Sequence, residues 1–144
     1  MKECVFCSKK EIRERSIVEN NLAWAFPTNI PITDGHILIS PKRCVATLRD
    51  LTEEERKDLL TLSDIIVLAL EKTFNAEGFN FAWNQGVLAG QSVPHLHLHV
   101  IPRKEGDTGL LGYDPRSFIY RTGEREPTKE EELIEIVGKI KKNL

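Results

Sequence analysis

The most informative stretch of this sequence alternates histidine with apolar residues: Pro94-His95-Leu96-His97-Leu98-His99-Val100-Ile101. In an extended strand, successive side chains point to opposite faces, so the histidines would share one face and the apolar residues the other. The apolar face can pack on a core, which leaves three imidazole rings along one surface. A lone strand histidine is usually an ordinary surface or core residue, but here three of the 4 histidines fall on one strand. We therefore predict a strand over residues 94–101 that carries a functional site.

This row of imidazoles suits phosphorus chemistry. Imidazole ionises near neutral pH, so one ring can be a neutral nucleophile while another is protonated and holds a phosphate oxygen or supplies a proton. Gln91 and Ser92 place an amide and a hydroxyl just before the histidines, and Gly86 and Gly90 allow close backbone approach or simply form a turn. A three-histidine zinc centre is the alternative. The pattern favours attack by His97, the middle histidine, on the phosphorus of a small nucleotide-type substrate.

Three cysteines form a second group of candidate ligands. Cys4 and Cys7 make a C-x-x-C motif near the first residue, without the preceding strand that thioredoxin-like redox sites have. The motif therefore favours zinc over a redox disulfide. Two thiolates are half of a tetrahedral site, and Cys44 is the only cysteine left to supply another ligand. The alternative for Cys44 is a small buried apolar residue.

Turn residues and apolar periodicity predict an antiparallel α+β domain. A long helix begins after Thr52, which forms a capping box with Glu55, and ends before Gly78. A second capping box, Thr128 with Glu131, opens a C-terminal helix. Short strands lie on either side of the long helix, over residues 16–19, 22–28, 36–40, 79–83 and 94–101.

Length and charge restrict the class of partner. The 144 residues suffice for one domain with a hydrophobic core. No segment approaches the ~20 apolar residues of a membrane helix, and the start, MKECVFCSKKE, lacks a signal peptide's apolar stretch, so we expect no membrane association and a cytoplasmic location. The net charge is −2, with Lys and Arg scattered among acids, whereas a chain that grips long nucleic acid usually shows a basic stripe. We expect a small-molecule ligand and no nucleic acid polymer.

Taken together, these motifs resemble the histidine triad (HIT) family. Residues 95–101 match its alternating motif, and residues 35–42 resemble its strand with a fourth active-site histidine. The resemblance implies one HIT domain over residues 1–144, with a zinc-binding N-terminus over about 1–10 and a C-terminal tail and helix over about 110–144. It also implies the HIT-like fold, an antiparallel sheet of about five strands with one long central helix and a C-terminal helix, in a homodimer whose sheet is continuous across the pair.

The resemblance further implies an activity, hydrolysis or transfer at the α-phosphate of a nucleotide conjugate. His97 falls on the nucleophile, which forms a covalent nucleotidyl-histidine that water then resolves. His99 falls on a phosphate-contacting position, and His36 on the supporting histidine. Family members often have Asp or Asn where this chain has Thr28, so the ribose contact would weaken or shift to the next residue. The implied substrate contacts are Asn84, Gln91, Ser92, Thr28 and Asn29.

Some members of the family bind zinc through two N-terminal cysteines, a residue after the Pro-Lys strand and the first triad histidine. The matching residues here are Cys4, Cys7, Cys44 and His95. The third ligand is usually a histidine in the family, but a thiolate binds zinc equally well. The resemblance therefore implies a structural Cys3His zinc site without an open position for water.

A segment near the C-terminus narrows the expected substrate. Residues 112–121 resemble a tail of the branch that includes the dinucleoside polyphosphate hydrolases, the Fhit-like proteins. The similarity favours dinucleoside polyphosphates over phosphoramidates. A nucleoside phosphoramidate hydrolase and a non-catalytic nucleotide-binding adaptor are the alternatives.

Overall fold

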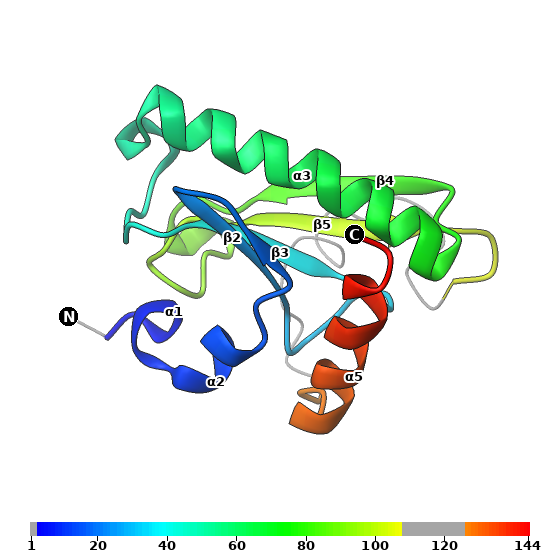
Figure 1. Cartoon of the computed structure of the whole chain (residues 1–144). Helices are drawn as coiled ribbons and strands as arrows, with labels where there is room; N and C mark the ends of the chain where they lie inside the picture. Colours follow the sequence, from blue (N-terminus) through cyan, green and yellow to red (C-terminus); the bar gives the residue numbers. More distant parts are fainter. Residues whose placement is uncertain (1–2, 108–125) are drawn as a thin grey trace.

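The computed structural model describes residues 3–107 and 126–144, and there the chain forms a five-stranded antiparallel sheet in the order β1-β2-β3-β5-β4 (Figure 1). The predicted α+β class, with its long helix and C-terminal helix, is confirmed. Residues 112–121, which resemble the tail of the dinucleoside polyphosphate hydrolase branch, lie outside the described residues. The strands are β1 Val18–Glu19, β2 Ala23–Pro27, β3 Ile37–Pro41, β4 Gly78–Trp83 and β5 Leu98–Arg103.

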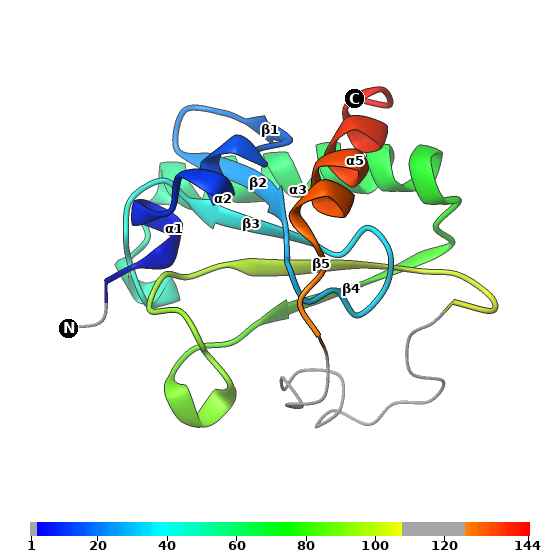
Figure 2. The same ribbon diagram turned by 90° about the horizontal axis from the view of Figure 1, so that it is seen from below.

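Helices lie on both sides of this sheet. Figures 1 and 2 show α3 across one face and the two short helices α1 and α2 on the opposite side, while α5 packs against α3 and β2. No helix in the described parts of the chain is long and apolar enough to cross a membrane. The helices are α1 Val5–Ser8, α2 Lys10–Glu14, α3 Glu53–Phe74 and α5 Glu130–Lys141, with 3-10 turns η1 Leu48–Asp50 and η2 Val87–Ala89.

The alternation of side chains along the strands divides the core in two. Ile37 and Ile39 of β3 pack toward α3, whereas Leu38 between them joins a smaller cluster with Phe6 of α1. Residues that pair directly across antiparallel strands share a face. Leu38 pairs with Phe26 on one side and with His99 on the other, so the strands carry these three side chains on the face toward α1 and α2.

The long helix begins as the sequence predicts. The Thr52 hydroxyl accepts a hydrogen bond from the Glu55 amide at 3.1 Å, and the Glu55 carboxylate accepts one from the Thr52 amide at 2.8 Å. Arg43 donates to both oxygens of Glu55, which fixes this buried carboxylate. The helix ends at Asn75, whose backbone is left-handed.

The second predicted capping box is wrong. The N-cap of α5 is Lys129, without a side-chain hydrogen bond, and the helix begins at Glu130. Thr128 instead donates its backbone N–H to the carbonyl of Asn29 at 2.6 Å. The chain before α5 is therefore tied to the loop after β2.

The predicted strand over residues 94–101 is wrong in its first half, because β5 begins only at Leu98. Pro94 has no N–H to donate to a sheet. The Leu96 amide donates to the carbonyl of Val45 at 2.7 Å, and the Leu96 carbonyl accepts from the Ser40 hydroxyl. These contacts hold the segment before β5 against neighbouring loops.

Candidate functional site

A cavity of about 840 Å³ lies between the sheet, the α1–α2 segment and the start of α5. The lining includes apolar side chains from all three sides. It also includes most of the polar residues that the sequence singles out, and these are His36, His97, His99, Asn84, Ser92, Thr28 and Asn29. Chain segments more than sixty residues apart thus meet at one pocket.

His97 is held in one tautomer by the backbone. It lies one residue before β5, is 6% exposed, and its Nδ1 is 2.8 Å from the carbonyl oxygen of His95. A carbonyl only accepts, so Nδ1 carries the proton and Nε2 keeps its lone pair. Burial lowers the pKa of His97, an effect that the hydrogen bond to the His95 carbonyl opposes. The ring is therefore neutral and nucleophilic at neutral pH.

His99 is oriented through a chain of hydrogen bonds. The Ile32 amide donates to His36 Nδ1 at 3.0 Å, which leaves the proton of this ring on Nε2. His36 Nε2 lies 2.9 Å from His99 Nδ1 and donates to it. The proton of neutral His99 is consequently on Nε2, which is buried and has no hydrogen-bond partner among the described residues. This N–H is available to an acceptor in the pocket.

The charge state of His99 agrees with this role. Burial and, to a smaller extent, the neighbouring His97 lower the pKa of His99 to about 3. The rings of His97 and His99 lie 4.9 Å apart, close enough to contact one bound group. Before an anion binds, His99 is thus a neutral donor.

The loop before the histidines supplies further polar groups. Asn84 follows β4 directly and is buried at the pocket. Ser92 also lines the pocket, after a turn in which Gly86 and Gly90 have positive φ. Gln91 is placed differently, because its amide accepts from the Gly86 N–H at 2.7 Å and donates to the carbonyl of Ala46 at 3.0 Å. It braces this loop and is not part of the pocket lining.

Thr28 and Asn29 form another part of the wall. The Thr28 hydroxyl accepts from the Ile30 amide at 3.2 Å, and its own proton is available for another acceptor. The carbonyl of Asn29 accepts the Thr128 bond described above. The start of α5 is thereby fixed beside the position expected to contact a ribose.

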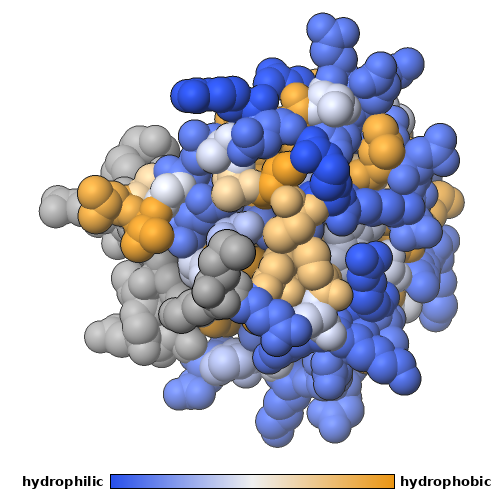
Figure 3. Space-filling model, turned by 90° about the vertical axis from the view of Figure 1, so that its left-hand side faces the viewer, coloured by the Kyte–Doolittle hydropathy of each residue, from blue (hydrophilic) through white to orange (hydrophobic). Residues whose placement is uncertain are grey.

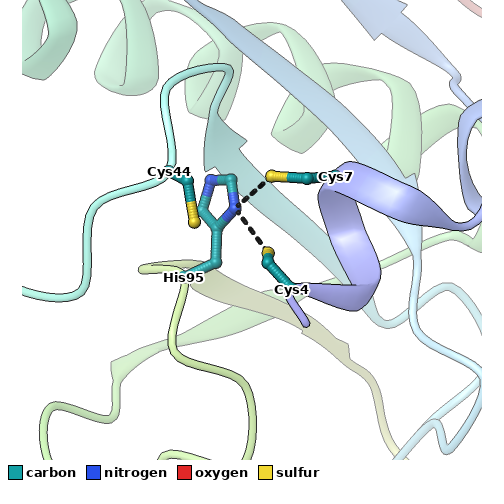
Figure 4. A group of neighbouring side chains, drawn as sticks. All are labelled: Cys4, Cys7, Cys44 and His95. Carbon is teal, nitrogen blue, oxygen red and sulfur yellow. Dashed lines mark hydrogen bonds between the residues drawn. The ribbon is translucent and has the colours of Figure 1, made fainter. Parts of the chain in front are cut away.

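Beside the pocket, Cys4, Cys7, Cys44 and His95 converge (Figure 4). Their ligand atoms all lie within 4.8 Å of one another. The Nε2 of His95 donates to the carbonyl of Pro41 at 2.7 Å, so Nδ1 keeps its lone pair and lies 3.2 Å from Cys4 Sγ and 3.6 Å from Cys7 Sγ. His95 is 1% exposed and does not share the pocket of the other two triad histidines, which corrects the expectation of three rings over one surface.

This Cys3His group could hold a metal ion. In a tetrahedral zinc site, with Zn–S near 2.3 Å and Zn–N near 2.0 Å, ligand atoms lie roughly 3.5–3.8 Å apart. The distances from Cys4 and Cys7 to His95 need little adjustment to meet this requirement. Loss of hydration and the adjacent Cys4 sulfur raise the pKa of Cys7 to about 12, and the same causes raise the pKa of Cys44. A metal cation between the sulfurs would oppose this rise in pKa, because it stabilises the thiolate forms that bind it.

Two residues of this region, Phe6 and Arg15, were not singled out from the sequence. Phe6, between the paired cysteines, packs edge-on against His97 at 5.3 Å and against Phe26 at 5.0 Å. Its position follows from the cysteines on either side, a signal that was present in the sequence. Arg15, at the end of α2, is buried and lines the pocket. Nothing in the local pattern distinguishes it from a surface arginine.

Comparisons with known proteins show which proteins this chain is similar to. A bis(5'-adenosyl)-triphosphatase of Dictyostelium discoideum is 40% identical over 114 residues, 78% of this chain and 73% of the relative. An asymmetrical bis(5'-nucleosyl)-tetraphosphatase of Schizosaccharomyces pombe is 39% identical over 107 residues, 74% of this chain and 59% of the relative. An adenosine 5'-monophosphoramidase of Candida albicans is 31% identical over 141 residues, 92% and 93% of the two chains.

Coverage differs among these relatives. The chain spans 59% of the S. pombe protein and 26% of a nitrilase and fragile histidine triad fusion protein from Caenorhabditis elegans. A zinc-bound histidine triad family protein from Mycobacterium smegmatis superimposes with a TM-score of 0.71 at 27% identity, covering 97% of this chain and 94% of that one. The family model described as HIT domain matches residues 9–106. The resemblance seen in the sequence is confirmed, and the chain belongs to the HIT domain family.

Proposed function

We propose that this protein hydrolyses or transfers the nucleotidyl group of a nucleotide conjugate, with His97 as the nucleophile. The observation that carries the proposal is the bond from His97 Nδ1 to the His95 carbonyl. It leaves the Nε2 lone pair on a neutral ring that lines the pocket. A nucleophile must be deprotonated and held in place, and both conditions are met before substrate binds.

The reaction proceeds in two displacements at the α-phosphorus. His97 Nε2 forms a bond to phosphorus as the bond to the leaving-group oxygen or nitrogen breaks, and the leaving group takes up a proton from solvent. Water then attacks the nucleotidyl-histidine and gives up a proton to solvent as the P–N bond breaks, so the nucleoside monophosphate leaves with the ring neutral again. His99 Nε2–H donates to a phosphate oxygen, and His36 positions His99 through the bond between their rings.

Dinucleoside polyphosphates are the substrates that we favour. The relatives from D. discoideum and S. pombe are named for this activity, and a cavity of about 840 Å³ leaves room beyond a mononucleotide. Asn84 and Ser92 would contact the phosphate, and Thr28 with Asn29 the ribose. Phosphoramidate hydrolysis is the second candidate, because the C. albicans phosphoramidase matches over 93% of its length.

Zinc is the metal that we assign to Cys4, Cys7, Cys44 and His95. Three thiolates and one imidazole are a typical structural zinc set and leave no position for water, so the metal supplies rigidity and takes no part in the chemistry. The same thiolates bind metal only while reduced, which favours a cytoplasmic location. We also propose that residues 1–144 form a single domain, in which this metal site anchors the N-terminal segment.

We further propose that the protein is a homodimer joined along β4. This strand is an edge of the sheet, and its Phe81 is 53% exposed. Leu60 and Leu68 on the outer face of α3 are also exposed, and unpaired strand edges with apolar side chains favour self-association. Light scattering on the purified chain would show a dimer, and a Phe81→Glu variant would shift the mass toward the monomer.

The proposed activity is tested with diadenosine tetraphosphate labelled at the α-phosphates. We expect release of labelled AMP and, after an alkaline quench, label attached to the protein, since a phosphorus–nitrogen bond to histidine survives alkali better than acid. A non-catalytic adaptor would bind the nucleotide without releasing AMP. Absence of both nucleoside monophosphate and labelled protein, with this substrate, with its diguanosine counterpart and with adenosine phosphoramidate, would reject the proposal.

A further inference from the structure

One residue of the pocket lining is a buried arginine whose guanidinium is incompletely hydrogen-bonded within the described residues. Arg15 is 6% exposed, and its Nε has no partner among the residues that the structure describes. Among the described residues its ion pair is with Glu130, with Nη1 3.4 Å from a carboxylate oxygen. An arginine carries five N–H donors, and leaving even one of them buried without a partner is costly unless a ligand supplies an acceptor. Both residues line the pocket.

This pair lies on the nucleoside side of the pocket. Glu130 begins α5, and the chain just before it is tied to Asn29 through the Thr128 bond at 2.6 Å. Because Thr28 and Asn29 form the wall proposed to contact ribose, we expect the base attached to that ribose to reach Glu130 and its partner Arg15. Apolar walls for a flat ring are present in the same cavity, from Ile12 and Phe26.

The ion-pair partner of Arg15 favours a base over a phosphate at this position. Glu130 lines the pocket beside Arg15, and its carboxylate would repel a phosphate dianion bound against the pair. A neutral base that carries acceptors and donors can satisfy the guanidinium and the carboxylate together. Guanine presents the acceptors O6 and N7 and a donor at N2, whereas adenine presents a donor, N6, where guanine has O6.

We propose that Arg15 and Glu130 form the base-reading end of the pocket and make it select guanine over adenine nucleotides. Arg15 donates to O6 and N7, and Glu130 accepts from the N1–H and the N2 amino group. Adenine would set its N6 donor against the guanidinium and leave part of the charge unpaired. This inference rests on the proposed function, because it places the α-phosphate of the same nucleotide at His97.

The test uses the full chain and three monophosphates that are products and do not turn over: GMP, IMP and AMP. Titration calorimetry should show GMP binding roughly tenfold or more tighter than AMP. Arg15→Met should bring GMP to the affinity of AMP. Arg13→Met is the matched control, because Arg13 lies two residues away over the Trp24 ring, 4.8 Å from its centroid, and should keep the preference.

A second variant covers the case in which Arg15→Met fails to fold. Glu130→Gln changes a half-exposed carboxylate and should bring GMP to the affinity of IMP, which lacks the N2 amino group. Equal affinities of the wild type for GMP and AMP would overturn the inference while leaving the proposed function intact. Equal weakening of both nucleotides by Arg15→Met would also overturn it, because that outcome marks a phosphate contact. Failure of every monophosphate to bind would instead count against the proposed function.

Discussion

His95 and His97 are two residues apart and both buried, yet they belong to different sites. His95 donates from Nε2 to the Pro41 carbonyl and presents Nδ1 to the cysteine sulfurs. His97 does the reverse, donating from Nδ1 to a carbonyl and keeping Nε2 for the pocket. In each ring, a backbone carbonyl decides which nitrogen keeps its lone pair. This difference suits His95 to the proposed metal site and His97 to the proposed attack on phosphorus.

The two sites are also physically joined. The carbonyl that orients His97 belongs to His95, the candidate metal ligand. Phe6, between two candidate ligands, packs on the rings of both histidines, at 5.6 Å from His95 and 5.3 Å from His97. The two sites therefore differ in the chemistry of their side chains, but the same residues, His95 and Phe6, help to position both of them. Figure 3 shows apolar side chains exposed on one face of the molecule. The most exposed large apolar side chains of the described residues are Val87 and Leu88, at 85% and 98%.

The largest expected effect contrasts the two histidines directly. His97→Ala removes the proposed nucleophile, so kcat should fall by about 10⁴-fold or more, while metal content and thermal stability stay close to wild type. His95→Ala should instead lose the metal and lower the melting temperature, with a smaller loss of turnover. Turnover and metal content are measured on the same preparations. A His97→Ala protein that keeps about one tenth of wild-type activity would show that another group attacks phosphorus.

The next effect concerns the Cys3His group alone. Cys4→Ser removes one of the four candidate ligands, so bound metal should fall well below one per chain and the free energy of unfolding by about 3 kcal/mol or more. For a chain of this length, that corresponds to a drop of roughly 6–12 °C in melting temperature. Metal analysis and thermal unfolding check both values. Retention of a full equivalent of zinc in both Cys4→Ser and Cys44→Ser would favour the alternative, in which His95, His97 and His99 bind the metal.

A smaller effect tests the hydrogen-bond chain behind His99. His36→Leu removes the donor to His99 Nδ1 and frees that ring to change tautomer, so kcat should fall by about 10- to 100-fold with the metal retained. Thr33→Val is the matched control, because it removes a neighbouring buried hydrogen bond, from Thr33 to the Pro102 carbonyl at 2.8 Å, without touching an imidazole. It should cost stability and leave kcat unchanged. Equal losses of activity in the two variants would assign His36 a purely structural role.

Much of the fold could be predicted because its signals are local. The capping box at Thr52 and the apolar spacing after it fixed the start of the long helix, and the apolar strand before Pro41 fell within one residue of β3. The start of β5 and the start of α5 were misplaced because long-range contacts, which the local sequence does not reveal, act on both segments. The chain just before β5 is hydrogen-bonded to Val45, and the chain just before α5 is hydrogen-bonded to Asn29.

Some residues of the candidate site could likewise be predicted from local sequence signals, and others could not. The four metal-binding candidates and His97 were identified from their residue types and spacing, aided by the family resemblance, and the structure brings the four together. The helices α1 and α2 were not predicted, because each is only four or five residues long and depends on packing by Phe6 and Ile12. Arg15 escaped notice because only tertiary burial separates it from a surface charge.

The smallest expected effect is on stability and follows from the neutral state of His99. Its pKa is about 3 in the folded chain, against about 6.5 when unfolded, so acid protonates the unfolded state first and stability falls as pH drops below 6.5. At pH 5.5 this one histidine should account for about 1.4 kcal/mol of lost stability relative to pH 7.5. Urea unfolding of the wild type and of His99→Asn at both pH values isolates the contribution, because all other titrating groups are common to the two proteins. The variant should lose less stability than the wild type by that amount. An identical loss in both proteins would mean that His99 is already charged in the folded protein. The pocket histidines would then not be neutral, and they would no longer differ in this way from the proposed metal site at Cys4, Cys7, Cys44 and His95.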